Sequence, residues 1–174
     1  MADRLVLDES GGVRTIAGGN SVNVVGTAAS ETIVANQGAN VTNFSASSGE
    51  ESDVIHLAGS ISDFEITSAG NTIEFDDQDV NGEEVTVSLN GDTEIRFADG
   101  STTAGIDTSG ETPQVQLGGV DVPQTTLDTS QVTLDGDATS QARETGQTIE
   151  LTGGDDEVDP GTFIPEDKTT DQND

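Results

Sequence analysis

Acidic side chains gather between residues 76 and 84, where their spacing could hold a metal ion. Residues 77–84 read DQDVNGEE, with oxygen-bearing side chains at alternate positions ahead of a glycine, as in the first half of a calcium-binding loop. The twelfth loop position is Ser88, inside an expected strand, which excludes a helix-loop-helix calcium site. A β-loop holding Ca²⁺ and a solvated acidic hairpin both remain open. The candidate ligands are Asp77, Asp79, Asn81, Glu83 and Glu84.

The segments on either side of this loop are expected to be β-strands. Polar and apolar residues alternate over 72–75, 84–89 and 93–97, which predicts three strands that each bury one face. Asn90-Gly91 separates the second and third runs and favours a tight type I′ hairpin between them. The segment is therefore expected to form three consecutive antiparallel strands. A further hairpin is expected around Gly118-Gly119, between the apolar residues of 115–117 and 120–122.

The N-terminal part has a shorter period. Residues 18–44 place apolar residues between small ones at intervals of eight rather than nine, a degenerate match to the nonapeptide glycine-aspartate repeat of calcium-binding parallel β-rolls. In that alignment Asn23 and Glu31 stand where aspartate belongs. Simple strands with Gly, Ala and Ser turns are the competing interpretation. In the following acidic loop, Glu50, Glu51 and Asp53 could join an ion site or could simply be solvated.

Composition restricts the partners. The chain has 34 acidic and five basic residues, a net charge of −29 and no cysteine. The negative electrostatic potential of such a chain repels nucleic acid and anionic membranes, so cations are the expected partners. The carboxylates either keep the surface hydrated in concentrated salt, where screening is strong, or are neutralised locally by divalent ions.

Groups for catalysis are scarce. The sequence shows no Ser/His/Asp order, no Cys/His pair and no phosphate-binding glycine loop, and its single histidine, His56, is expected to pack in a strand. An enzyme is not expected. The first residues, MADRLVLDES, carry no signal-peptide pattern and no segment reaches transmembrane length, so any export is expected to use another route.

Between about Val25 and Val122 the chain resembles a known family. GTAASETIVA, DVIHLAG with SDFEI, NGDTEIRFADGS, IDTSG and QVQLGGVDV are similar to a β-domain near the C-termini of large RTX-type bacterial surface proteins. The resemblance implies type I export, a location outside the cell or on its surface, and a role in adhesins, surface layers or matrix, often with calcium.

We therefore expect an all-β fold: an antiparallel β-sandwich of jelly-roll or immunoglobulin-like topology, with a short β-solenoid-like N-terminal part and an extended acidic C-terminal tail. Residues 1–122 should form the sandwich core and 153–174 the acidic tail. Residues 123–152 should form additional strands, either packed on their own chain or exchanged with a neighbouring subunit.

The leading hypothesis is an extracellular structural protein that self-assembles into a fibre, surface layer or adhesive matrix. A strand or tail that docks on the open sheet edge of the next copy would make a filament. Candidate assembly residues are Thr125, Leu127, Val132, Leu134, Phe163 and Ile164. The alternatives are a calcium- or glycan-binding β-module, with its site in the loops at Asp77 and Asp99, and a structural protein of a virus from a saline host.

Overall fold

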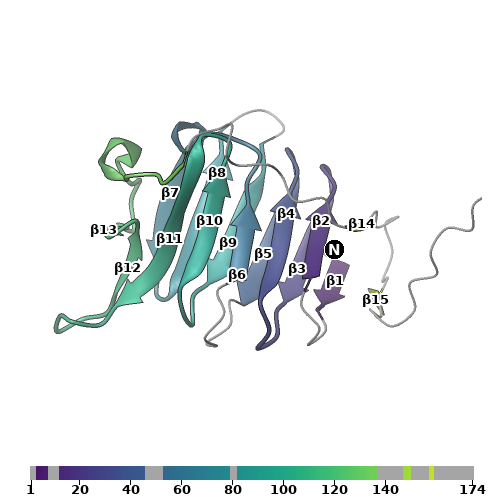
Figure 1. The fold of residues 1–174 in the computed structure, drawn as a ribbon, viewed down its shortest axis with the longest axis horizontal. Helices are drawn as coiled ribbons and strands as arrows, with labels where there is room; N and C mark the ends of the chain where they lie inside the picture. Colours follow the sequence, from purple (N-terminus) through teal and green to yellow (C-terminus); the bar gives the residue numbers. More distant parts are fainter. Residues whose placement is uncertain are drawn as a thin grey trace, which may run out of the picture.

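The protein is an all-β sandwich of two sheets (Figure 1). The structure, a computed structural model, describes residues 3–7, 12–45, 53–78, 82–136, 147–149 and 157–158. One sheet contains, in spatial order, β15 (Glu157–Val158), β1 (Asp3–Val6), β3 (Ser21–Val25), β5 (Asn40–Ser45), β9 (Glu84–Ser88), β8 (Thr72–Asp77) and β7 (Phe64–Ala69). The other contains β13 (Val120–Asp121), β12 (Gln114–Leu117), β11 (Gly100–Asp107), β10 (Thr93–Phe97), β6 (Asp53–His56), β4 (Glu31–Ala35), β2 (Gly12–Ile16) and β14 (Gln147–Ile149). Two 3₁₀ turns, η1 (Ile61–Asp63) and η2 (Thr129–Gln131), complete it.

The first six strands form a parallel coil. Successive strands alternate between the two sheets, and within each sheet β1, β3 and β5, or β2, β4 and β6, pair in parallel. The turns of this coil stack as well, since Gly19 N–H donates to Gly38 O at 2.8 Å and Asn40 N–H donates to Asn20 O at 2.8 Å. The N-terminal part thus has the solenoid arrangement, and the sandwich is mixed rather than purely antiparallel.

Strands after β6 pair mainly as antiparallel neighbours. Hairpins join β7 to β8, β8 to β9, β10 to β11 and β11 to β12. The predicted hairpin at Gly118-Gly119 is confirmed as β12–β13, and both glycines have positive φ, 59° and 77°, as a type I′ turn requires.

The predicted Asn90-Gly91 hairpin is wrong. All three predicted strands exist, as β8, β9 and β10, and β8 pairs with β9 across the acidic loop. However, β9 lies between β8 and β5 in one sheet, and β10 lies between β6 and β11 in the other. Asn90-Gly91 therefore crosses between the sheets, and Gly91 does not adopt a positive φ. Pairing with the parallel coil outweighed the local turn preference.

The core lies between the two sheets. Apolar residues that alternate along the strands are fully buried there, including Ile33, Ile55, Ile73, Val87 and Ile95. Three phenylalanines from different strands pack edge to face or tilted, with ring centroids 5.8–6.4 Å apart: Phe64, Phe75 and Phe97. Burial of these side chains is the main stabilising contribution to the fold.

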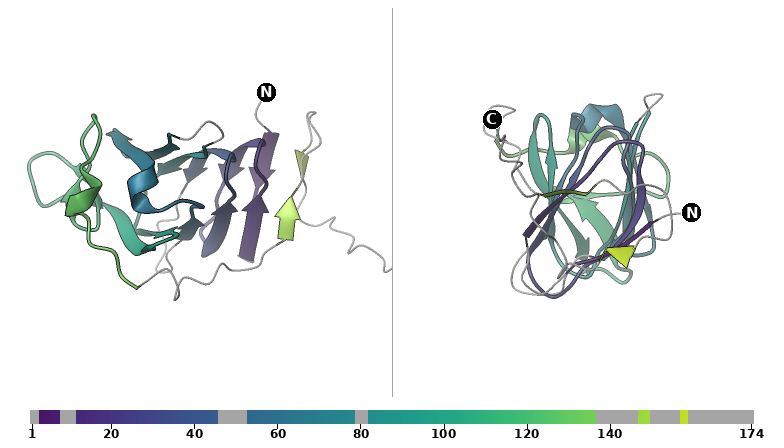
Figure 2. Two further views of the ribbon diagram at one scale, coloured as in Figure 1. Left: turned by 90° about the horizontal axis from the view of Figure 1, so that it is seen from above. Right: turned by 90° about the vertical axis from the view of Figure 1, so that its right-hand side faces the viewer.

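The two ends of the sandwich are closed differently. At the end formed by β7 and β13, residues 122–135 fold back over the strands, and Leu127 N–H donates to Ile66 O at 2.9 Å. At the other end, β14 pairs in parallel with β2, and β15 pairs in parallel with β1. Both views in Figure 2 place these two short strands as the last layer beside β1 and β2.

Candidate functional site

The acidic loop between β8 and β9 closes tightly. Asp77 N–H donates to Glu83 O at 2.9 Å. A Cβ at Gly82 would lie only 2.0 Å from Asp77 O, so glycine is required for the two strands to approach here. The glycine of the calcium-like pattern thus has a structural role that needs no ion. Asp79 and Asn81 lie outside the described residues.

The other predicted ligands diverge. Glu83 is fully buried and its Oε1 accepts the main-chain N–H of Ala58 at 2.6 Å. Glu84 points to a different neighbour, because its Oε2 accepts Asn40 Nδ2 at 2.8 Å. The structure therefore does not bring the carboxylates of Glu83 and Glu84 together, and calcium in this loop stays a prediction.

Asp77 lines a small hollow at the η1 end of the sandwich. The hollow encloses about 210 Å³ and is also lined by Gln37, Ala58, Gly59 and Asp63. Gln78 N–H donates to Asp63 O, which ties the acidic loop to η1.

The loop at Asp99 reaches the same 3₁₀ turn. Asp99 Oδ1 accepts Ile61 N–H at 3.0 Å, and Asp63 Oδ2 accepts Ser60 N–H at 2.7 Å. The loops at Asp77 and Asp99 both contact η1, through Gln78 and Asp99. The carboxylates of Asp63 and Asp99 hold main-chain N–H groups of the turn, and a ligand site in these loops stays a prediction.

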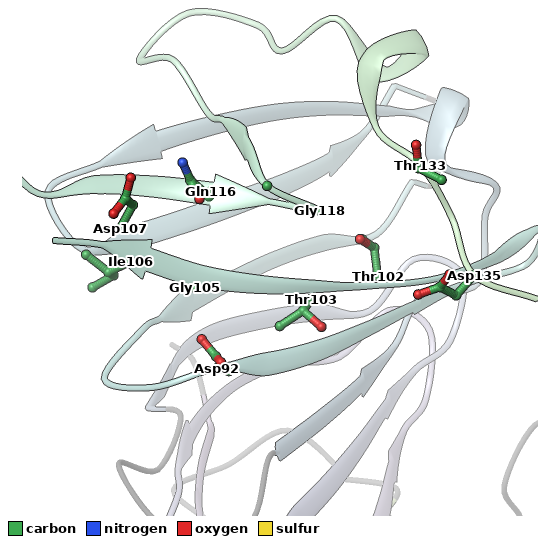
Figure 3. A pocket seen from close by; sticks show the side chains of 11 residues that line it. Asp92, Thr102, Thr103, Gly105, Ile106, Asp107, Gln116, Gly118, Thr133 and Asp135 are labelled. Atoms are coloured by element: carbon green, nitrogen blue, oxygen red, sulfur yellow. The ribbon is translucent and has the colours of Figure 1, made fainter. Parts of the chain in front are cut away.

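A larger hollow lies on the outside of β11 and β12 (Figure 3). It encloses about 460 Å³ and its lining includes three carboxylates, Asp92, Asp107 and Asp135. A hydrogen bond from Ser109 N–H, 2.8 Å from Asp107 Oδ1, lowers the pKa of Asp107. A Cβ at Gly105 would meet Asp92 Oδ1 at 2.6 Å, so the absent side chain leaves room for Asp92. The hollow is open, polar and negatively charged.

An inward-facing polar row was not predicted as a unit. Glu31, Asp53 and Thr93 begin β4, β6 and β10, and they are 1%, 1% and 0% exposed. Asp53 and Thr93 are register partners, and Glu31 N–H donates to Asp53 Oδ1 at 2.9 Å. Glu31 had appeared only in the degenerate repeat and Asp53 only in the acidic loop. Their juxtaposition requires the parallel pairing of distant strands.

Burial raises the pKa of Glu31 above its ordinary 4.5. Asp53 raises it further by its charge and by the hydrogen bond that a protonated Glu31 would donate, whereas two hydrogen bonds from Thr27 oppose the rise. Thr27 donates its main-chain N–H at 2.8 Å and its hydroxyl to Glu31 Oε1.

His56 is 3% exposed and its Nε2 lies 3.0 Å from Arg96 Nη1. Arg96 also forms a bidentate ion pair with Glu94, with distances of 2.8 and 3.1 Å. Its burial and its contact with Arg96 agree with the expected packing of His56 within a strand.

The candidate assembly residues in the described segment lie against their own chain. Leu127 is 6% exposed and belongs to the core, and Val132 and Leu134 pack on it while partly buried. Thr125 is exposed. Phe163 and Ile164 lie outside the described residues. A single chain does not test exchange with a neighbour, so this stays a prediction.

Within the described ranges, no group of three or more Asp, Glu, His or Cys side chains is placed to hold a metal, and no helix there is long and apolar enough to span a membrane. Comparison with protein families, with curated proteins and with solved structures finds no match to this chain.

Proposed function

We propose that this protein is an extracellular structural subunit that self-assembles through the β1–β2 end of its sandwich. One observation carries the proposal: at that end, both sheets finish in parallel strands. Among the described residues, β14 covers one of them with three register pairs and β15 covers the other with two. Exposed strand edges are ready templates for another chain. A neighbour's C-terminal strands can make the same main-chain hydrogen bonds, which is β-augmentation.

Chain length permits both arrangements. Ten residues separate Gly136 from Gln147, enough to reach about 35 Å when extended. Asp135 bridges Ser101 on β11, five strands from β14 in the sheet, which is about 24 Å. The segment can therefore reach its own edge, and the same reach would serve an adjacent copy. A heterologous contact of this kind yields a filament when the rotation between copies does not close a ring.

The acidic composition is compatible with assembly at high salt. A charge of −29 with a single lysine keeps a surface hydrated at high salt, and screening there allows copies to approach. The resemblance to β-domains of RTX-type secreted surface proteins points to a location outside the cell. Cell fractionation with an antibody tests this: signal in the envelope or medium supports it, whereas signal only in virus particles would favour the capsid alternative.

Cysteine cross-linking tests the exchange directly, because the chain has no native cysteine. Thr15 and Thr148 are register partners, and neighbouring strands place Cα atoms about 4.8 Å apart, within disulfide range. Material of the Thr15→Cys/Thr148→Cys variant that forms fibres by electron microscopy should give a ladder of linked chains after oxidation and non-reducing electrophoresis. The same variant oxidised while dispersed should run as a monomer and should no longer assemble.

A matched control uses Glu74→Cys/Thr86→Cys, register partners within the β8–β9 hairpin, which should link only within one chain. Fibres whose Thr15/Thr148 links are all within one chain would exclude exchange. Dispersed particles at every salt and calcium concentration would overturn the assembly proposal itself.

The second candidate is a binding module, favoured by the hollow with Asp92, Asp107 and Asp135. Its carboxylates make the hollow negatively charged, although within the described ranges they are not grouped to hold a metal ion. Sugars usually stack on exposed aromatic rings, and the four phenylalanines of the described residues, Phe44, Phe64, Phe75 and Phe97, are buried.

A further inference from the structure

Two oxygens in the inward-facing polar row have no hydrogen-bond partner in the part of the chain that the structure describes. They are Glu31 Oε2 and Thr93 Oγ1, both within the sandwich. Native proteins pair nearly all such buried polar atoms, with protein, water or ions. These two buried oxygens are therefore suited to a further hydrogen-bond donor or a cation.

The three side chains form one buried row across adjacent strands. Glu31, Asp53 and Thr93 occupy equivalent inward positions on the adjacent strands β4, β6 and β10, one row beyond the buried isoleucines Ile33, Ile55 and Ile95. Thr27 holds Glu31 Oε1 through two hydrogen bonds, which fixes the carboxylate and leaves Oε2 to face another partner.

The spacing suits a calcium ion. Neighbouring strands lie about 4.8 Å apart, and calcium binds oxygens at about 2.3–2.6 Å, so oxygens on adjacent strands can bracket one ion. All available ligand atoms are oxygens, which selects hard cations over zinc or copper. A divalent ion also balances the two buried carboxylates, which would otherwise repel each other.

We infer that Glu31, Asp53 and Thr93 form a binding site for one divalent cation, with calcium as the best match. The two carboxylates supply the charge, the Thr93 hydroxyl supplies a neutral ligand, and Thr27 orients Glu31. Water or main-chain oxygens complete the six to eight ligands that calcium takes. This site is separate from the acidic β8–β9 loop and does not depend on assembly.

The test is calorimetric titration of the full chain with calcium chloride, after chelator treatment and dialysis. Wild-type protein should bind one saturable calcium ion that raises the thermal unfolding midpoint. Glu31→Gln, which keeps the size of the side chain, should lose that ion. Thr93→Val, which removes only the hydroxyl, should weaken binding at least about tenfold. Circular dichroism verifies that each variant folds.

Glu74→Gln is the matched control, because Glu74 lies on the outer face of β8 and is only partly buried. It should retain the bound ion and the midpoint shift. Equal calcium binding by wild type and Glu31→Gln would overturn the inference. A second result would also overturn the inference: the unfolding midpoint of the wild type does not change with calcium, but in calcium-free buffer it falls as the pH rises above about 4.5, through the raised pKa of Glu31. That behaviour indicates a proton shared between the two carboxyl groups.

Discussion

The two halves of the sandwich obtain their registers in different ways. In the parallel coil, β1 to β6, each strand pairs with one two places away along the sequence, and the intervening turns stack through main-chain hydrogen bonds. In the half from β7 to β13, most neighbours are joined by hairpins. Register is thus set by the stacking of layers in the first half and by turn chemistry in the second.

The outer ends of these two halves also differ in how they are covered. The hairpin end is closed by a segment with a buried anchor, Leu127, and partly buried apolar residues beside it. The coil end is covered by five register pairs from two strands in the last 28 residues of the chain. One closure belongs to the core, and the other is suited to exchange.

The largest expected effect concerns these closures. Leu127→Ala should lower the free energy of unfolding by about 3 kcal/mol, because it leaves a cavity in the core. Removal of residues 147–174 should cost less than about 1 kcal/mol, comparable to loss of a frayed edge, yet should abolish assembly. Urea denaturation measures both. A truncation as costly as Leu127→Ala would show that the β1–β2 end needs its own cap.

A smaller effect probes the stacked turns of the coil. A Cβ at Gly18 would lie 2.2 Å from Gln37 O, so Gly18→Ala must separate two layers and should destabilise the protein by about 2 kcal/mol. Gly110→Ala is the control, because the nearest atom to its Cβ is Thr112 O at 3.7 Å. Equal midpoints in thermal unfolding would argue against the stacked register.

The smallest expected change in stability distinguishes the hairpin at Gly118-Gly119 from the crossing between sheets at Asn90-Gly91. Gly119→Ala forces a left-handed φ of 77° on alanine in open space and should cost about 1 kcal/mol. Gly91→Ala should stay within about 0.5 kcal/mol, since Gly91 lacks a positive φ. If Gly91→Ala cost as much as Gly119→Ala, the predicted Asn90-Gly91 hairpin would be restored.

The sequence by itself determined the element type and the faces. Alternation predicted β8, β9 and β10 as strands with one buried face, because a period of two is a property of each strand alone. The glycine pair 118–119 predicted its hairpin for a similar reason, since the positive φ requirement is local. Together with the all-β class, these are the features that short-range chemistry controls.

Only the tertiary structure decided which strands pair and which polar residues meet. Val87 and Ile95 face the core whether β9 and β10 share a sheet or lie opposite each other, so alternation could not distinguish the two arrangements. Glu31, Asp53 and Thr93 are separated by 22 and 40 residues in sequence. They became neighbours because parallel pairing aligns the starts of β4, β6 and β10, a non-local choice made by burial of the whole core.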